Sequence, residues 1–418
     1  MKITYILPVY WPAVGGCEIH THELVMRMSE KHEVNVLTLL NDQQDKLSSA
    51  LWFAAILRAP RTAQSYQDNK AKVTRIPLSI GEKAVTFPMA RIQSPKIPPF
   101  IRNAAMELLS SKFEKILSKF VMDCDVIHCV HGGVSYLGYA SLKLARKKSI
   151  PFIYTPLLHP RLSDAGSELH IIPRGWNDEV WLNICEKADA LLTMTEFEKD
   201  FFVDHGISKG KVSHIGVGPV IANNGDEKKF LEKYRINGNS KRVLFLGRNH
   251  ESKGIDSLLE AAQIVWRKYP DTYFFFVGPQ EGRTQQIFSK FMDNRIIKTG
   301  EVSLSEKTAA LKACDVFCMP SLEESLGGVF LEAWSFGKPV IGGDIPPVRE
   351  LIEDEKGGFL VKSDPAEIAQ RITTLLDDEA MRRRMGEWGK AKVHNNFTWD
   401  VITKKVEDVY SRCLGFEG

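Results

Sequence analysis

The first forty residues alternate in a way that few folds accommodate. An apolar segment, KITYILPV (2–9), leads into the glycine-containing turn WPAVGG (11–16). Residues 18–32 follow with helical spacing of apolar side chains, and 34–40 form a second continuous apolar segment. Strands that are apolar along their whole length and joined through a helix are typical of a parallel sheet covered by helices on both faces. The sequence therefore predicts that the chain begins as a βαβ unit.

This alternation continues through most of the 418 residues, with two interruptions. Residues 46–120 include proline-containing stretches, for which we expect loops or helices rather than regular βαβ units. Residues 221–241 are polar and rich in Asn, Gly and Lys, which is typical of a linker. The sequence predicts an α/β protein with two Rossmann-like, doubly wound lobes facing a cleft: residues 1–220, a linker at 221–241, and residues 242–399.

Composition and cysteine usage indicate the cellular compartment in which the protein is expected to reside. The chain is 44% hydrophobic and 26% charged, as in globular proteins. Its seven cysteines are never spaced as CxxC, which fits a reducing environment. The N-terminal apolar segment is too short for a signal peptide, and the longest clean apolar run, near 51–57, is far below the roughly 18 residues of a bilayer span. We expect a cytoplasmic protein whose membrane contact, if any, is peripheral.

Charge is distributed unevenly along the chain. Residues 1–150 hold 20 Lys and Arg against 12 Asp and Glu, whereas the remaining 268 residues hold 35 against 40. The basic excess fits an ordinary solvated surface, and it also fits contact with acceptor phosphates or with an anionic inner membrane face. No recognised nucleic-acid-binding motif accompanies this charge, so we do not expect a nucleic-acid partner.

The stretch PSLEESLGGVFLEAWSFGKPVI (320–341) holds the strongest local pattern in the sequence. A strand is expected to end at Met319, and a helix to begin near Gly327 or Gly328. The backbone amides of Leu326, Gly327 and Gly328 would then lie at a helix N-terminus, where a diphosphate binds favourably.

Two carboxylates in this stretch, Glu324 and Glu332, are spaced as E-x7-E. Carboxylates accept hydrogen bonds from vicinal hydroxyls, so one could hold a sugar and the other a ribose. The alternative is that Glu324 caps the helix and Glu332 is a surface residue.

Two cations follow the first strand of the same lobe. Arg248 and Lys253 lie just after RVLFLG (242–247) and could neutralise a leaving diphosphate without a metal. The alternative is a pair of solvated loop charges. Asp123 and Asp125 resemble a metal-binding DxD, but they lead directly into an apolar strand, so no metal site is expected.

Three residues of the N-terminal lobe are further candidates. Gly15 and Gly16 occupy the first strand-to-helix turn, where glycine allows a phosphate to approach the backbone. His159 follows the strand FIYTP and could touch a reacting sugar, although a lone histidine is more often structural.

Taken together, these motifs resemble the large retaining family of GT-B glycosyltransferases, the family 4 type or glycosyl transferases group 1. The resemblance covers nearly the whole chain and rests on GGCE (15–18), DVIH (125–128), ADALLTMTEFEKDFF (188–202), FLGRNHESKG (245–254), FVGP (276–279) and residues 320–341. It implies an N-terminal acceptor-binding lobe, a C-terminal donor-binding lobe, and a C-terminal helix (400–418) that crosses back to the first lobe.

The resemblance also implies roles for single residues. By similarity, Glu324 contacts the donor sugar, Glu332 the ribose, and Arg248 and Lys253 the diphosphate. Gly16 would contact the diphosphate from the other lobe, and His159 would lie beside the sugar. The backbone near Glu301 and Val302 would read the nucleotide base.

The function expected from this resemblance is transfer of a hexose with retained anomeric configuration. The donor would be a UDP-, GDP- or ADP-sugar, and the acceptor a saccharide, a lipid-linked sugar or a small molecule, as in polysaccharide or glycolipid biosynthesis. No metal or other cofactor is expected. Two alternatives remain open: a sugar-nucleotide epimerase with the GT-B fold, and a noncatalytic GT-B partner protein. The oligomeric state is not predicted.

Overall fold

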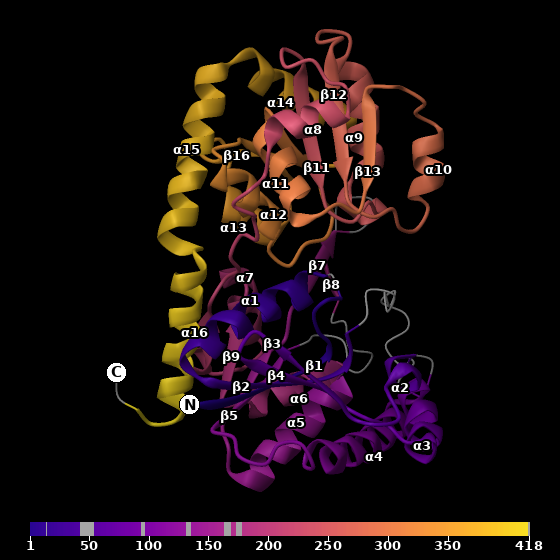
Figure 1. Cartoon of the computed structure of the whole chain (residues 1–418), viewed down its shortest axis with the longest axis vertical. Helices are drawn as coiled ribbons and strands as arrows, with labels where there is room; N and C mark the ends of the chain where they lie inside the picture. The colour runs from indigo at the N-terminus through magenta and orange to yellow at the C-terminus, as the bar shows by residue number, and fades with distance from the viewer. Residues whose placement is uncertain are drawn as a thin grey trace. The chain divides into compact units, whose positions relative to one another are not determined.

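The computed structural model of the chain describes residues 1–13, 15–41, 54–92, 97–130, 135–162, 169–172 and 178–416. These residues form two compact units (Figure 1). Unit 1 comprises Met1–His159, Ile172–Gly216 and Ile402–Gly418, and unit 2 comprises Pro160–Ile171 and Val217–Val401.

Unit 1 is built on an eight-stranded sheet with the order β10-β9-β6-β5-β1-β2-β4-β3. All neighbouring strands are parallel except β3 and β4, which form an antiparallel hairpin at one edge. The strands are β1 (Lys2–Val9), β2 (Glu33–Leu40), β3 (Gln64–Asp68), β4 (Ala71–Arg75), β5 (Val126–Val130), β6 (Phe152–Thr155), β9 (Ala190–Thr193) and β10 (Val212–His214). A separate two-stranded sheet pairs β7 (His159–Leu162) with β8 (Leu169–Ile172).

The predicted alternation of strand and helix holds from β1 to β2, which are joined by one helix. After β2 the order of helices and strands departs from it. The helices of unit 1 are α1 (Gly16–Lys31), α2 (Ala54–Arg58), α3 (Ile80–Arg91), α4 (Pro99–Leu117), α5 (Ser135–Lys148), α6 (Asp178–Lys187), α7 (Glu196–Asp204) and the 3₁₀ turn η2 (Lys209–Lys211). Helix α3 begins at a capping box in which Ser79 and Glu82 bond to each other's backbone amides. The expectation of loops or helices over 46–120 thus holds for α2–α4 and misses the β3–β4 hairpin.

Unit 2 contains a six-stranded sheet in which every neighbouring pair is parallel. Its order is β13-β12-β11-β14-β15-β16, so the strand order reverses between β11 and β14. The strands are β11 (Lys241–Leu246), β12 (Thr272–Val277), β13 (Ile296–Gly300), β14 (Val316–Met319), β15 (Val340–Gly343) and β16 (Gly358–Val361). In doubly wound sheets ligands bind beyond the carboxyl ends of the strands at this reversal point.

Helices of unit 2 cover both faces of this sheet, and all its strands except the edge strand β13 are buried along most of their length. They are α8 (Glu227–Lys233), η3 (Glu251–Lys253), α9 (Ile255–Val265), α10 (Thr284–Ser289), α11 (Leu304–Ala313), α12 (Gly328–Ser335), α13 (Pro346–Ile352), α14 (Pro365–Asp377) and α15 (Glu379–Asn396). Trp334 of α12 is fully buried and donates a 2.9 Å hydrogen bond to the Gly357 carbonyl.

The chain passes between the two units four times: before and after Pro160–Ile171, after Gly216 and after Val401. It leaves unit 1 after Gly216, and residues 221–241 belong to unit 2, where they include α8. Helix α16 (Trp399–Cys413) starts in unit 2, and its residues from Ile402 onward belong to unit 1. Among the helices described, none combines the length and the hydropathy that a bilayer span requires.

Candidate functional site

The candidate site of unit 2 lies at the reversal point of its sheet, where the loops after β11 and β14 meet. Lys253, which ends η3, donates hydrogen bonds from Nζ to Glu324 Oε1 and to the Glu323 carbonyl, both at 2.7 Å. The side chains of Lys253 and Glu324 are only 15% and 12% exposed. The two candidates from the separate sequence motifs therefore form one largely buried ion pair.

Gly254 allows these two loops to approach each other. It adopts a left-handed conformation (φ 73°), and a Cβ at this position would lie 2.2 Å from the Pro320 carbonyl oxygen. Since no side chain tolerates that distance, only glycine can join η3 to α9 in this geometry. The close backbone approach places Lys253 next to Glu324.

Helix α12 begins at Gly328, as the sequence predicts, and Gly327 is its left-handed N-cap (φ 83°, ψ 57°). No side chain caps this helix, so Glu324 does not serve as the helix cap that the alternative interpretation proposed. Leu326 is buried, and the unsatisfied amides of the first turn and the helix dipole favour an anion at this end.

Glu332 lies in the second turn of α12 and is only 6% exposed, which excludes the surface role considered as its alternative. Its Oε1 accepts hydrogen bonds from Lys307 Nζ at 2.7 Å and from the Val220 amide at 3.3 Å. Its Oε2 is buried and has no hydrogen-bond partner within the described part of the chain. A buried carboxylate oxygen without a donor is uncommon and suggests that a ligand supplies one.

The remaining candidates of unit 2 lie on loops around this centre. Arg248 follows β11, is half-exposed and pairs with Glu281 Oε2 at 3.2 Å. Glu301 and Val302 lie between β13 and α11, with Glu301 exposed and Val302 half-buried. Their backbone is thus placed just before the helix that carries Lys307.

The candidates of unit 1 lie on its own strand ends. Gly15 is the N-cap of α1, and Gly16 is the exposed first residue of that helix. His159 begins β7, but its side chain lies outside what the structure describes. Asp125 accepts a 2.7 Å hydrogen bond from the Lys2 amide, and Asp123 pairs with the Lys2 ammonium. Both carboxylates of the DxD pattern therefore tie the entrance of β5 to β1.

Two polar residues of the site are missing from the sequence-based candidates. Lys307 is one, because its contact with Glu332 joins two helices and no local pattern reports it. Asn249 is the other: it is fully buried, and its Nδ2 donates a 2.7 Å hydrogen bond to the Gly278 carbonyl, joining the loops after β11 and β12. A buried asparagine directly after Arg248 could have been suspected from its place at a strand end.

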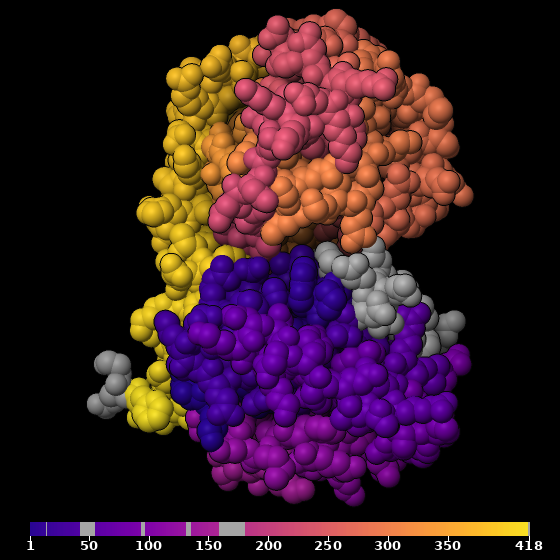
Figure 2. All heavy atoms as spheres, viewed as in Figure 1, coloured from indigo at the N-terminus to yellow at the C-terminus, as the bar shows by residue number. Residues whose placement is uncertain are grey.

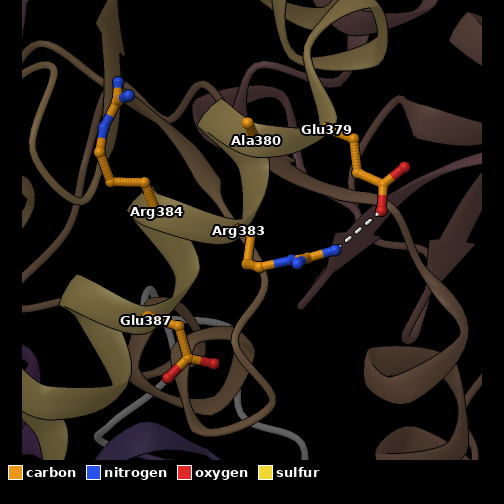
Figure 3. A pocket seen from close by; sticks show the side chains of 5 residues that line it. All are labelled: Glu379, Ala380, Arg383, Arg384 and Glu387. Carbon is orange, nitrogen blue, oxygen red and sulfur yellow. Dashed lines mark hydrogen bonds and ion pairs between the residues drawn. The ribbon is translucent and has the colours of Figure 1, made fainter.

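A separate surface depression lies along helix α15 (Figure 3). It is lined by Glu379, Ala380, Arg383, Arg384 and Glu387, and Arg383 pairs with Glu379 at 3.1 Å. All of these residues come from one helix, and both members of that pair are about three-quarters exposed. Exposed pairs of this kind contribute little free energy, and none of these residues belongs to the candidate site.

Two family models match the chain. Residues 14–218 match Glycosyltransferase Family 4, and residues 226–392 match Glycosyl transferases group 1. The chain belongs to the group 1 glycosyltransferases, which have the GT-B fold. The family and the α/β fold class with two parallel-sheet lobes, both predicted from the sequence, are thereby confirmed.

Individual relatives are consistent with this assignment. An uncharacterized glycosyltransferase of Methanocaldococcus jannaschii (MJ1069) is 24% identical over 98% of each chain. The phosphatidyl-myo-inositol mannosyltransferase of Mycobacterium tuberculosis is 30% identical over 47% of this chain and 54% of its own length.

Solved structures with the same fold include sucrose-phosphate synthase from Thermosynechococcus elongatus, with a TM-score of 0.71 and 18% identity over the full length of both chains. Anabaena HepE in complex with UDP has a TM-score of 0.70 and 18% identity, over 99% of this chain and 100% of HepE.

Proposed function

We propose that this glycosyltransferase transfers a hexose from a nucleotide-diphospho-sugar, held by unit 2, to a hydroxyl-bearing acceptor with retention of configuration and without a metal. One observation supports the donor site above all others. Glu332 is buried, its Oε1 accepts hydrogen bonds from Lys307 and the Val220 amide, and its Oε2 has no hydrogen-bond donor among the described residues. The Lys253–Glu324 pair and the α12 N-terminus, at the same end of the sheet, supply the complementary groups for phosphate and sugar.

Each group of unit 2 then has a role that suits its chemistry. Lys253 and Arg248 neutralise the diphosphate, together with the amides from Leu326 to Gly328. Glu324 accepts hydrogen bonds from the sugar hydroxyls, and Glu332 from the ribose. The backbone near Glu301 and Val302 contacts the base. For Gly15, Gly16 and His159 a role in donor binding remains a proposal from the family resemblance.

The proposed reaction breaks the bond between the sugar C1 and the terminal phosphate oxygen and forms a bond from C1 to the acceptor oxygen on the same face. The acceptor proton passes to the leaving phosphate oxygen, so atoms and charge balance. In this proposal the protein contributes positioning and stabilisation of the developing charge on the diphosphate. The position of Lys253 beside Glu324 and the uncapped N-terminus of α12 support that role.

The relatives support some choices of substrate over others. HepE has been solved with UDP and with UDP-glucose, which favours a UDP-sugar among the UDP-, GDP- and ADP-sugars. The mycobacterial relatives are named for transfer to phosphatidyl-myo-inositol, which favours a lipid-linked acceptor among the saccharide, lipid-linked and small-molecule alternatives.

Ligand-dependent thermal stability and product analysis test this function. The UDP-, GDP- and ADP-sugars are added one at a time, with and without magnesium, and a donor that binds the folded state raises the melting temperature by mass action. We expect one donor class to do so equally well without magnesium, and NMR of the product to show the donor's anomeric configuration. An altered sugar nucleotide formed without acceptor would indicate the epimerase instead. Donor binding without turnover on a broad acceptor panel would indicate the noncatalytic protein.

We also propose that helices α3 and α4 dock peripherally on an anionic membrane at the cytoplasmic face. Helix α3 packs between α2 and α4 on one side of unit 1, and residues of α3 and α4 are at its surface in the space-filling view (Figure 2). Of the ten exposed large apolar side chains among the described residues, seven lie between residues 57 and 122, including Phe100, Ile101 and Leu108. The exposed lysines 112, 115 and 119 add positive charge beside them.

Co-sedimentation with vesicles tests this docking. We expect binding to vesicles containing phosphatidylglycerol, weaker binding in high salt, and little binding to phosphatidylcholine alone. Phe100→Ser should weaken it, whereas Met292→Ser, which removes an exposed side chain from unit 2, should not. Binding that ignores lipid charge, or that survives Phe100→Ser unchanged, would contradict the proposal.

A further inference from the structure

The buried carboxylate of Glu332 has protein donors at only one of its two oxygens among the described residues, and one of these donors comes from helix α11. Lys307, in its first turn, forms an ion pair with Glu332 Oε1 at 2.7 Å, and the lysine side chain is itself only 19% exposed. The Val220 amide donates to the same oxygen at 3.3 Å. Glu332 Oε1 therefore has two protein donors, while Oε2 has none among the described residues.

The position of Val220 also depends on α11. Three side chains of this helix fasten the segment that follows Val220: Thr308 Oγ1 accepts from the Ala222 amide at 2.9 Å, Lys312 Nζ donates to the Gly225 carbonyl at 2.9 Å, and Ser305 Oγ donates to the Asn224 carbonyl at 3.1 Å. A Cβ on Gly225 would lie 2.7 Å from Thr308 Cγ2, so the segment runs directly along the helix. Helix α11 thus holds both donors to Glu332 Oε1, because it carries Lys307 and fastens the segment that follows Val220.

This arrangement fixes which oxygen of Glu332 meets a ligand. A buried carboxylate is stable only when its charge is compensated, and Lys307 supplies that compensation through Oε1. Because Oε1 is engaged, the carboxylate cannot rotate about its terminal bond without breaking an ion pair. Oε2 remains as the oxygen that can accept from a ligand hydroxyl, in a fixed direction.

We propose that Lys307 is a positioning residue that orients Glu332 Oε2 toward the vicinal hydroxyls of the donor ribose and thereby sets the preference for ribonucleotides over deoxyribonucleotides. This inference rests on the proposed function, since it assumes that unit 2 binds a nucleoside diphosphate. Lys307 acts through Glu332 and does not itself touch the nucleotide.

Calorimetric titration provides the test. The wild-type protein is titrated with UDP, GDP and ADP, and the tightest of these is compared with its 2′-deoxy and 3′-deoxy forms. Loss of a hydrogen bond to a charged group is expected to weaken binding of at least one deoxy form about 10- to 100-fold. In Lys307→Met this discrimination should fall to about 3-fold or less, because Oε2 is no longer held in one direction.

Two variants serve as controls, one for the charge at position 307 and one for the loss of a lysine elsewhere in unit 2. Lys307→Arg keeps the ion pair and should restore most of the discrimination. Lys268→Met removes a lysine whose exposed ion pair with Asp377 lies outside the candidate site, so it should discriminate as the wild type does. In a Glu332→Gln background, Lys307→Met should cause no further loss of discrimination. Circular dichroism and melting temperatures check that each variant is folded.

The outcomes separate failure of this inference from failure of the proposed function. If Lys307→Met weakens the ribo and deoxy forms equally, or if its effect persists in the Glu332→Gln background, Lys307 is not acting by orienting Glu332 and the inference is overturned. If the wild type binds none of the three nucleoside diphosphates, the proposed donor site itself fails, and the inference with it.

Discussion

Replacing Lys253 with methionine tests the core of the candidate site, because this lysine joins its two loops. Methionine keeps the length of the apolar stem but removes both 2.7 Å hydrogen bonds, to Glu324 Oε1 and to the Glu323 carbonyl. Since the Glu324 side chain is only 12% exposed, its carboxylate loses its partner in a poorly hydrated place. We expect the free energy of unfolding without donor to fall by about 1–3 kcal/mol.

The larger effect is expected on the donor. A hydrogen bond from a charged group to phosphate contributes about 1.5–3 kcal/mol, so its loss weakens binding roughly 10- to 150-fold. With donor at 100 times the wild-type Kd, the wild type gains about 2.7 kcal/mol of stability. A variant with 100-fold weaker binding gains only about 0.4 kcal/mol from the same donor concentration.

Urea unfolding with and without the donor measures both quantities. Lys268→Met is the matched control, because Lys268 forms an exposed ion pair with Asp377 at 2.6 Å outside the candidate site. It should keep the full donor-induced gain. If Lys253→Met also keeps a gain of about 2.7 kcal/mol, Lys253 does not hold the diphosphate and the assignment of the site is refuted.

Three other changes have defined outcomes. Gly254→Ala forces a side chain against the Pro320 carbonyl in a left-handed conformation, and we expect a loss of about 1–3 kcal/mol or more in urea unfolding; an unchanged midpoint would contradict the close approach. Burial lowers the pKa of His20 to about 4, below its ordinary value near 6.5, so the unfolded chain takes up the proton first. Stability should therefore fall as pH drops from about 6.5 to about 4, and His20→Leu should show a smaller fall; an equal fall in both proteins would refute this cause. Tyr410→Phe removes a buried hydroxyl that shares a 2.6 Å hydrogen bond with His128 Nδ1 and donates a 3.0 Å hydrogen bond to the Tyr5 hydroxyl, and should cost about 1–3 kcal/mol in urea unfolding; a variant as stable as the wild type would show that these two bonds together contribute nothing net.

The parts of the fold that the sequence predicted are those with local signals. Residues 2–9 and 34–40 are apolar throughout, and the structure has strands at Lys2–Val9 and Glu33–Leu40. The edge strand β3, QSYQD, was not predicted, because it is mostly exposed and so lacks an apolar face to reveal it. Tertiary pairing with β4, rather than sequence pattern, makes this segment a strand.

The polar stretch 221–241 illustrates a different limit. Its composition is typical of a linker, yet α8 within it is capped by Asp226 and buries Phe230 and Leu231. The chain instead changes units at the short sequence around Gly216, which has no linker composition. Composition reports average polarity, whereas a single pair of buried side chains decides whether a short helix docks.

Sequence alone could predict only those residues of the candidate site that lie within contiguous motifs or directly after a predicted strand. Glu324, Glu332 and the α12 N-terminus share one stretch, and Lys253 follows a strand end, so sequence alone singled them out. The partner of Glu332 could not be found this way. Lys307 lies 25 residues away on another helix, and only the packing of α11 beside α12 brings the two together.

The pairing of cations with carboxylates in unit 2 has a consequence for the speed of donor capture. Arg248, Lys253 and Lys307 each face a carboxylate of the protein's own, so these six side chains together carry no net charge. From these six side chains an approaching dianion meets little long-range attraction. If Arg248 and Lys253 hold the diphosphate as proposed, the donor's charge is recognised only after contact, when phosphate oxygens compete with Glu281 and Glu324 for these two cations. Association should therefore be slow compared with electrostatically steered encounters and should change little with ionic strength.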